Sequence, residues 1–283
     1  MRTDCPACGG DDLREHRPIS SKLSSPKVWP ESVVPSGCIF SECAACGHVF
    51  LADATYPEHG YREAAADPDE HPWFFTDRDA LVDLALAEMR RLTGRRTLRI
   101  LDFGCAYGNV SRMFLDRGQQ AVGYDIAEHQ AEYARSHYGI PAWSGRWEDA
   151  ATQIGAVDVI FSQNVFEHLP DPRGTLSAIS ANLASGGIVY ITVPNFESEQ
   201  VGYRPQEHLH YFRPRGLARL VERAGFRVCL LRSGRPGIEM FRRLTGRIPP
   251  LGVVRAVEAV TRRCGWHGYS ITIAAKKTVS SKQ

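Results

Sequence analysis

The sequence lacks several features that would assign it to a special class of protein. No hydrophobic run in the 283 residues is long enough to cross a bilayer, and Met1-Arg2-Thr3-Asp4 does not open an export signal. The 34 Lys and Arg nearly balance the 32 Asp and Glu, so net charge gives no reason to expect nucleic acid as a partner. We also find no internal repeat. These absences predict a cytoplasmic globular protein with no membrane partner.

Cysteine is the first feature that is present in a pattern. Without an export signal, the eight cysteines are expected to be reduced or metal-bound rather than paired in disulfides. Four of them form two matching pairs, each with two residues between and a glycine after: Cys5 and Cys8, then Cys43 and Cys46. Two such pairs supply the four ligands of a closed tetrahedral Zn²⁺ site, which is structural. Four unrelated thiols are the alternative, and Cys38 and His48 are nearby substitute ligands.

A strand followed by a glycine-containing turn forms the centre of the remaining sequence. The apolar stretch 98–101 leads into an acid, Asp102, and a turn through Gly104 and Gly108, after which an amphipathic helix is expected up to Gly118. Glycines in such a turn let the backbone approach a ligand closely. Backbone N–H groups and the helix dipole also converge there. The stretch therefore predicts a nucleotide-like ligand.

Strands and helices alternate after this turn, which predicts a parallel sheet with helices on both faces. Further strands are expected at 120–125, near 142, and at 157–162, 188–193, 226–231 and 270–275. One helix is expected at about 77–92, and a second follows the strand at 120–125 and runs to about Tyr138. A third is expected from Asp171-Pro172 to Ala184, before Gly186-Gly187, and a fourth from Pro214 to Gly225.

The turn resembles motif I of class I S-adenosylmethionine-dependent methyltransferases, although Ala106 replaces one of the family's glycines. The resemblance implies a Rossmann-like, doubly wound α/β sheet of seven strands, with the last strand antiparallel, beside a small N-terminal zinc-ribbon-like module. It also implies that the methionine end of the cofactor is held by Asp102, Gly104, Cys105, Ala106 and Gly108.

An acid follows the next strand, about twenty residues after the glycine turn. Asp125, followed by Ile126, is placed to accept hydrogen bonds from both ribose hydroxyls of a nucleoside, although a helix N-cap is an alternative role for it. In the methyltransferase family the loop at 144–149 borders the adenine. Arg146 stands where an acid is common, so the adenine contact is expected from Trp147 and Glu148, unless Trp147 belongs to the core.

The segment 161–172 resembles one found in ubiquinone-pathway methyltransferases. The resemblance places Gln163 near the methionine moiety of the cofactor. Glu167 and His168 follow, and they are candidates either for catalysis or for ordering the loop.

A third cluster of titratable residues lies at 206–212. A neutral histidine such as His208 is a suitable base for a hydroxyl, an amine or a carbon acid, and Glu207 is placed to orient it. The segment resembles one in deoxysugar C-methyltransferases, which also carry a four-cysteine zinc module and in which the Glu-His pair is assigned to proton abstraction. His210 is a further catalytic candidate, and a structural histidine is the alternative. Five residues are predicted to bind substrate: Tyr56, Tyr61, Trp73, Asn195 and Tyr211.

These patterns predict a domain order. Residues 1–55 form the zinc module, 56–96 a linker with a helical lid, 97–276 the cofactor-binding domain, and 277–283 a disordered tail. The arginine-rich insertion 234–269 is either a packed helix with a solvated basic face or a lid that meets an anionic group.

The predicted function is transfer of a methyl group from S-adenosylmethionine to an oxygen, nitrogen or carbon atom of a small-molecule acceptor. An RNA methyltransferase that uses the zinc ribbon for binding is one alternative. A catalytically inactive cofactor-binding or interaction protein is another. The sequence does not name the acceptor or the oligomeric state.

Overall fold

The computed structural model describes residues 2–18, 38–52, 79–198, 201–204, 207–233, 253, 256 and 268–278. The chain divides into two compact units. The cysteine unit comprises 1–56, 164–177 and 192–283, and the glycine-turn unit comprises 57–163 and 178–191. Among the described residues, no helix is long and apolar enough to cross a membrane.

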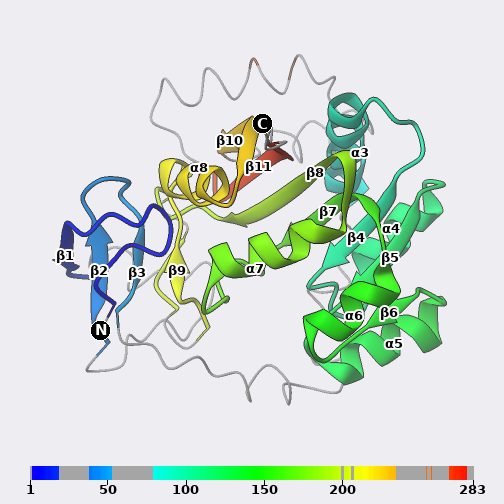
Figure 1. The fold of residues 1–283 in the computed structure, drawn as a ribbon, viewed down its shortest axis with the longest axis horizontal. Coiled ribbons are helices and arrows are strands. Elements are labelled where there is room, and N and C mark those ends of the chain that lie inside the picture. The colour runs from blue at the N-terminus through cyan, green and yellow to red at the C-terminus, as the bar shows by residue number, and fades with distance from the viewer. Residues whose placement is uncertain are drawn as a thin grey trace, which may run out of the picture. The chain divides into compact units, whose positions relative to one another are not determined.

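The main sheet has seven strands in the order β10-β11-β8-β7-β4-β5-β6. These are β4 (Arg99–Phe103), β5 (Gln120–Tyr124), β6 (Ala142–Trp143), β7 (Val157–Gln163), β8 (Leu183–Pro194), β10 (Phe226–Ser233) and β11 (Ser270–Lys277) (Figure 1). Strands β4 to β7 pair in parallel, with Asp102 opposite Gly123, whereas β10 and β11 pair antiparallel. This arrangement confirms the predicted doubly wound sheet with an antiparallel last strand.

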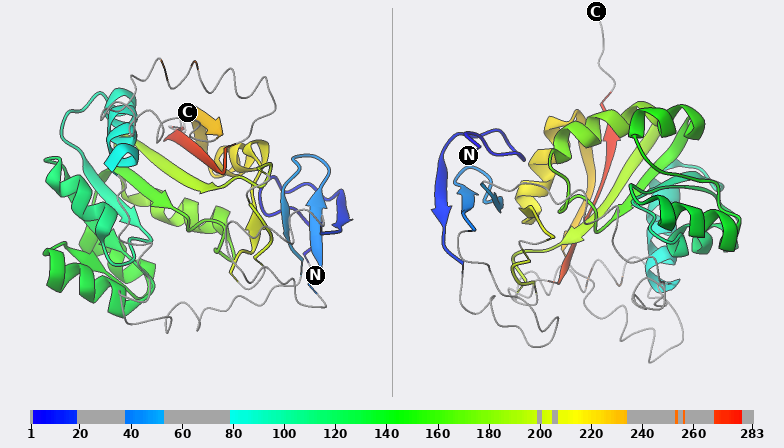
Figure 2. Two further views of the ribbon diagram at one scale, coloured as in Figure 1. Left: turned by 180° about the vertical axis from the view of Figure 1, so that it is seen from behind. Right: turned by 90° about the horizontal axis from the view of Figure 1, so that it is seen from below.

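Helices cover the sheet of the glycine-turn unit. They are α3 (Asp79–Thr93), α4 (Asn109–Asp116), α5 (Glu128–Tyr138) and α6 (Trp147–Ile154). Helices α4 and α5 pack against β5, and α3 contacts α4 (Figure 2). Apolar side chains such as Phe114 and Met89 are fully buried beneath them. The sequence pattern predicted α3 to α5 but assigned the start of α6 to a loop.

One predicted helix ends earlier than expected. Helix α7 (Pro172–Ile179) passes into a short 3₁₀ turn, η3 (Ser180–Asn182), and β8 begins at Leu183. The Asn182 side chain donates to the carbonyls of Ala151 and Gly155, at 2.7 and 2.8 Å. Gly187 then lies inside the strand, where an added Cβ would come within 3.0 Å of the Asp158 carbonyl oxygen. Gly187 therefore serves close strand packing, and the glycine pair lies within β8 and does not end the helix.

The cysteine unit contains a second, four-stranded sheet in the order β1-β2-β3-β9. Strands β1 (Leu13–His16), β2 (Phe40–Cys43) and β3 (Val49–Leu51) come from the N-terminal segment, and β9 (His210–Tyr211) comes from far along the chain (Figure 1). All three pairings are antiparallel, and Val49 lies opposite Tyr211.

The N-terminal segment shares its core with residues around β9. The buried cluster contains Phe40, Val49, Leu51, Phe196, Tyr203, Leu209 and Tyr211. This segment therefore buries its apolar face against residues that lie about 150 positions later in the chain. Helix α8 (Pro214–Arg223) follows β9 and contacts β10 and β11 in the same unit.

Candidate functional site

The glycine turn lies between β4 and α4 in the glycine-turn unit. Gly104, Ala106 and Gly108 have φ angles of 80°, 47° and 84°, in the left-handed region. A Cβ on Gly108 would lie 2.8 Å from the Cβ of Ala134 on α5, so only glycine fits between the two helices. The N–H groups of Gly104 and Cys105 donate to the Tyr124 carbonyl at 2.8 and 3.0 Å, which ties the turn to β5.

Asp125 connects the glycine turn to the start of α5. Its Oδ2 accepts from the Ala106 N–H at 2.8 Å, and its Oδ1 accepts from the Ala127 N–H at 3.0 Å. Burial raises the pKa of this carboxyl group, although both N–H groups oppose the shift. The N-cap residue of α5 is Ala127, which makes no side-chain cap bond. Asp125 therefore holds the turn and the helix start together.

Asp102 and Cys105 occupy the buried side of the same turn. The Ser111 hydroxyl of α4 donates to Asp102 Oδ2 at 2.7 Å, and Asp102 is 3% exposed. Burial raises the pKa of the Cys105 thiol well above its usual value, so this group stays neutral. Its sulfur would lie 2.8 Å from a Cβ on Gly123. Ser111 was not identified from the sequence, because a serine in a helix carries no signal of its partner.

Three aromatic rings gather next to Asp125. The rings of Phe103 and Tyr124 are stacked, with centroids 5.3 Å apart. Trp147, half-buried at the start of α6, stands edge-on to both, at 5.6 and 5.1 Å. The Tyr124 hydroxyl donates to the Gly145 carbonyl at 2.7 Å. This cluster provides an apolar wall beside the turn.

The other predicted cofactor residues line the same strand ends with less constraint. Arg146 and Glu148 are exposed and face each other at 3.6 Å. Ile126, which follows Asp125, and Gln163, the last residue of β7, are partly exposed. Their assignment to cofactor binding stays a prediction.

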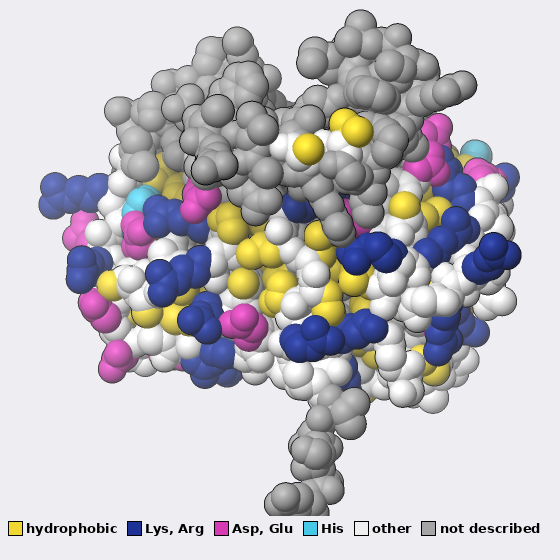
Figure 3. Space-filling model, turned by 90° about the horizontal axis from the view of Figure 1, so that it is seen from above, with side chains coloured by type: hydrophobic (Ala, Val, Ile, Leu, Met, Phe, Trp, Pro, Cys, Tyr) yellow, Lys and Arg dark blue, Asp and Glu magenta, His cyan; other side chains and the backbone are white. Residues whose placement is uncertain are grey.

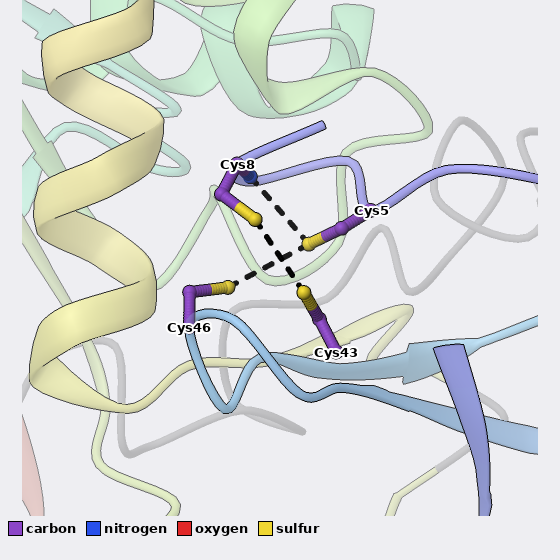
Figure 4. Close-up of side chains that lie close together, drawn as sticks. All are labelled: Cys5, Cys8, Cys43 and Cys46. Atoms are coloured by element: carbon purple, nitrogen blue, oxygen red, sulfur yellow. Dashed lines mark hydrogen bonds between the residues drawn. The ribbon is translucent and has the colours of Figure 1, made fainter. Parts of the chain in front are cut away.

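Four cysteine sulfurs converge in the cysteine unit (Figure 4). The Sγ atoms of Cys5 and Cys46 are 3.7 Å apart, and those of Cys8 and Cys43 are 3.4 Å apart. Tetrahedral Zn²⁺ with bonds of about 2.3 Å requires sulfurs about 3.8 Å apart, so the spacing fits this metal. Gly9 and Gly47, each directly after a cysteine pair, have φ angles of 69° and 70°, which each tight turn requires.

Contacts within the cluster and burial shift the pKa values of three of these thiols. A hydrogen bond from Cys46 lowers the pKa of Cys5 to about 5, whereas that hydrogen bond and burial raise the pKa of Cys46. Burial raises the pKa of Cys43 as well. Of the Cys5 and Cys46 pair, Cys5 is therefore the thiol that ionises more readily. In the described part of the chain, neither Cys38 nor His48 belongs to this cluster.

Three candidate catalytic residues converge elsewhere in the cysteine unit. Glu167, His168 and His208 offer ligand atoms that all lie within 4.8 Å of one another. Burial raises the pKa of Glu167 to about 8, and it lowers the pKa of His168 to about 4 and that of His208 well below its usual value. The two imidazole rings contact edge to face, with centroids 4.8 Å apart. Both imidazoles are therefore neutral near pH 7.

His210 has a different environment from His208. Its Nε2 donates to the Leu169 carbonyl at 2.9 Å, and its Nδ1 lies 3.1 Å from His48 Nε2. A carbonyl oxygen can only accept, so His210 Nδ1 accepts from the Nε2–H of His48. Both ring nitrogens are thus engaged.

The two predicted substrate residues that the structure describes are buried. The Asn195 side chain donates to Ser233 Oγ at 3.0 Å and to the Gly268 carbonyl at 2.9 Å, and it accepts from the Glu197 N–H at 3.1 Å. The Tyr211 hydroxyl accepts from the Arg204 N–H at 3.1 Å. The other three candidates, Tyr56, Tyr61 and Trp73, lie outside the described residues. Most of the insertion 234–269 also lies outside them.

Comparisons with known proteins identify relatives of the chain. A family model described as a methyltransferase domain matches residues 74–231. A ubiquinone biosynthesis O-methyltransferase of Idiomarina loihiensis is 31% identical over 129 residues, which is 42% of this chain and 52% of that protein. The C-methyltransferase NovU of Streptomyces niveus is 26% identical over 243 residues, which is 80% of this chain and 56% of that protein. The chain thus spans about half the length of the curated relatives it matches.

Solved structures share the fold at low sequence identity. The plantazolicin methyltransferase BpumL in complex with S-adenosylhomocysteine has a TM-score of 0.53 and 15% identity, with 78% of this chain and 94% of that chain covered. A methyltransferase from Archaeoglobus fulgidus has a TM-score of 0.50 and 21% identity, with 74% and 98% covered. Because the family model matches more than half of the 283 residues, the chain belongs to the methyltransferase domain family.

Proposed function

We propose that the protein transfers a methyl group from S-adenosylmethionine to a small-molecule acceptor. One observation carries the proposal: two buried acids flank the glycine turn at or just beyond the carboxyl ends of two adjacent parallel strands, and one of them, Asp125, is bonded to the turn whereas Asp102 is bonded to Ser111 of α4. Ligands of parallel α/β sheets bind at this edge. The methyltransferase family match and the S-adenosylhomocysteine complex of BpumL agree with this cofactor.

The two acids have distinct tasks in this proposal. Each carboxylate oxygen of Asp125 has accepted one N–H and keeps a second lone pair, so the same group can accept from a ribose diol. The buried charge of Asp102 favours the cationic methionine end of the cofactor. Phe103, Tyr124 and Trp147 provide an apolar wall suited to the adenine ring.

The bound cofactor supplies an electrophilic methyl group, and the protein supplies position and proton transfer. Alignment of the two reactants is worth about 7–11 kcal/mol of the barrier at best. A base adds about two to four orders of magnitude where the acceptor must lose a proton. His208 is our candidate because its imidazole is neutral and its Nδ1 accepts no hydrogen bond from the described residues. His168 positions it through the contact between the two rings. The Glu207 side chain is 44% exposed and pairs with Arg204, so Glu207 contributes through its backbone carbonyl, which accepts from His168. His210 has a supporting role because its ring is already bonded.

We also propose that Cys5, Cys8, Cys43 and Cys46 hold one Zn²⁺. Four thiolates close the coordination sphere and leave no position for a substrate, so this metal is structural. Its role is to fix the N-terminal segment, whose apolar side chains share a core with residues near β9.

A small molecule is a better acceptor than RNA for this chain. On the face drawn in Figure 3, Lys and Arg side chains are interspersed with acidic and uncharged ones. An RNA backbone is held by many cations acting together. The named relatives, a ubiquinone biosynthesis O-methyltransferase and a C-methyltransferase, favour an oxygen or a carbon as the acceptor atom.

The experiment that tests this function has two stages. Calorimetry with S-adenosylmethionine and S-adenosylhomocysteine measures binding, and Asp125→Ala should weaken both ligands. Formation of S-adenosylhomocysteine is then followed with phenols, amines and carbon acids as acceptors. Absence of cofactor binding in the wild-type protein would refute the proposal. Binding without turnover of any acceptor would favour the non-enzymatic alternative.

A further inference from the structure

We propose that Glu167, His168 and His208 bind one divalent transition-metal cation, at a site distinct from the four-cysteine cluster. All three residues belong to the cysteine unit, and they come from two loops about forty residues apart in the sequence. Binding of this cation does not depend on methyl transfer.

The positions of the donor atoms suit a metal. One carboxylate oxygen and one nitrogen from each imidazole lie within 4.8 Å of one another. Zn²⁺ with bonds of about 2.0–2.1 Å requires donors about 3.4 Å apart in a tetrahedron. Side-chain rotations that move the donor atoms by less than about 1.5 Å would therefore bring them to this separation.

Hydrogen bonds outside the donor set hold the ligands in place. His168 Nδ1 donates to the Glu207 carbonyl at 2.7 Å, and its Nε2 lies 3.7 Å from Glu167 Oε1. Metal-binding histidines characteristically donate their second N–H to a carbonyl or carboxylate in this way. The Glu167 carbonyl accepts from the N–H groups of Leu209 and His210, at 2.8 and 3.0 Å, which joins the two loops.

Three donor atoms in this cluster accept no hydrogen bond from the described residues. They are both carboxylate oxygens of Glu167 and the Nδ1 of His208, all of them buried. Glu167 is only 1% exposed. A buried polar atom without a partner is costly, and a cation bound by these residues would offset part of that cost. The competing explanation is a Glu167 that stays protonated and binds no cation.

The donor set indicates the kind of cation and its use. Two imidazoles and one carboxylate are typical ligands of Zn²⁺ and Fe²⁺ in sites that keep a position open for an oxygen ligand. An acceptor hydroxyl bound at such a position loses its proton more readily. This catalytic use, unlike cation binding itself, rests on the function proposed above.

The experiment is a Co²⁺ titration of protein that retains zinc in its cysteine cluster. Adventitious metal is first removed by mild chelation, and zinc content is checked by elemental analysis. We expect one Co²⁺ per chain in addition to zinc, with visible d–d absorption and without the charge-transfer bands of a cobalt–thiolate site. Addition of acetohydroxamate, an oxygen chelator, should shift the d–d bands because a coordination position is open.

Two variants remove a donor, and a third serves as a control. Glu167→Gln and His208→Gln should weaken Co²⁺ binding about 100-fold or more. His137→Gln removes an exposed imidazole on α5, so it should leave Co²⁺ affinity unchanged and report on surface binding. Circular dichroism and an unchanged zinc content show that each variant is folded.

The outcomes separate this proposal from the proposed function. Failure of wild-type protein to bind a second metal, or equal Co²⁺ affinity in Glu167→Gln, would overturn the cation site and support a protonated glutamic acid. Cofactor binding is measured separately, by calorimetry in protein stripped of the second metal. The presence or absence of cofactor binding therefore tests the proposed methyl transfer and not the cation site.

Discussion

The two candidate sites differ in how their acids are satisfied. In the glycine-turn unit, Asp125 accepts two backbone N–H groups and Asp102 accepts the Ser111 hydroxyl. In the cysteine unit, the carboxylate of Glu167 is equally buried but accepts no hydrogen bond from the described residues. Asp125 thus holds backbone in place and Asp102 holds a helix side chain, whereas the Glu167 carboxylate holds neither.

This difference indicates what each site does. A carboxylate that fixes a turn holds the turn in one shape, so the proposed cofactor site is formed before a ligand binds. A carboxylate without partners has its full hydrogen-bonding and ligating capacity left for a proton, a cation or a substrate. Substitutions in the first site should therefore change affinity, and substitutions in the second should change chemistry.

Removal of the metal from the cysteine cluster should have the largest effect. Cys43→Ser should abolish stoichiometric zinc and unfold strands β1 to β3, because zinc binding in comparable four-ligand sites is worth about 10–16 kcal/mol. Since Phe40 and Val49 share a core with Tyr203 and Tyr211, hydrogen exchange at β9 should accelerate as well.

Elemental analysis and amide exchange measure these effects. Cys38→Ser serves as the control, because Cys38 lies outside the cluster and its loss should leave zinc content unchanged. Wild-type protein without zinc, when purified in the absence of chelators, would refute the assignment.

Loss of the candidate base should have the next largest effect. His208→Ala should slow the single-turnover methyl-transfer step by about two orders of magnitude or more, with cofactor affinity nearly unchanged. The structure adds a refinement: burial lowers the pKa of His208 well below its usual value, so protonation of His208 should not slow the reaction at neutral or alkaline pH.

Metal removal separates the two possible roles of His208. If His208 acts as a base, methyl transfer should continue in protein that retains only the cysteine-bound zinc. If His208 acts as a metal ligand, methyl transfer should be lost in that protein. If His208→Ala keeps the wild-type single-turnover rate from about pH 6 to about pH 9, alignment of cofactor and acceptor alone accounts for catalysis. His168→Ala and His210→Ala would then need the same measurement.

Substitution of the two acids beside the glycine turn should change cofactor affinity rather than the methyl-transfer rate. Asp125→Ala should weaken S-adenosylmethionine binding by about 1.5–3 kcal/mol, because it removes charge-assisted hydrogen bonds and frees the Ala106 N–H of the turn. Asp102→Ala should also weaken binding, through the methionine end. Asp116→Ala, which removes an exposed acid from α4, controls for net charge. Unchanged calorimetric affinity in both Asp102 and Asp125 variants would place the cofactor elsewhere.

The parts of the structure predicted from the sequence are those built from consecutive residues. Asp102, Gly108 and Asp125 belong to one strand–turn–helix–strand segment, so their spacing alone indicated how they are arranged. Alternation of strands and helices likewise predicted the seven-stranded sheet, because a parallel connection leaves few topologies.

The features that the sequence did not predict depend on contacts between distant residues. Strand β9 has only two residues, too few to show a period, and its partner β3 lies about 160 positions earlier. For the same reason the sequence named Glu167 and His208 separately, although their loops are joined by backbone hydrogen bonds. Helix α7 gives way to a 3₁₀ turn whose Asn182 side chain bonds two carbonyls about thirty residues earlier in the chain, and no local pattern indicates such a contact.

A pair of glycine substitutions measures how tightly the glycine turn packs against α5. Gly108→Ala introduces a Cβ 2.8 Å from the Ala134 Cβ and 3.0 Å from Ile140 Cδ1, at a φ of 84°. Gly139→Ala has a similar φ of 65° but meets no atom within 4 Å. We expect the first to lower the free energy of unfolding by about 1–2 kcal/mol more than the second, since both share the backbone penalty and only one is overpacked. Equal destabilisation in a denaturant titration would mean that α5 is free to move away.

The smallest effect is expected at the second carboxylate of the cysteine unit. The Glu207 side chain is 44% exposed and pairs with Arg204 at 2.9 Å, so Glu207→Gln removes a surface ion pair worth at most about 1 kcal/mol. His168 is held by the backbone carbonyl of Glu207, which the substitution leaves in place. We therefore expect a change in the single-turnover rate of less than about tenfold for Glu207→Gln, against a much larger loss for Glu167→Gln. A large loss in the Glu207 variant alone would show that the exposed acid, rather than the buried one, serves His208.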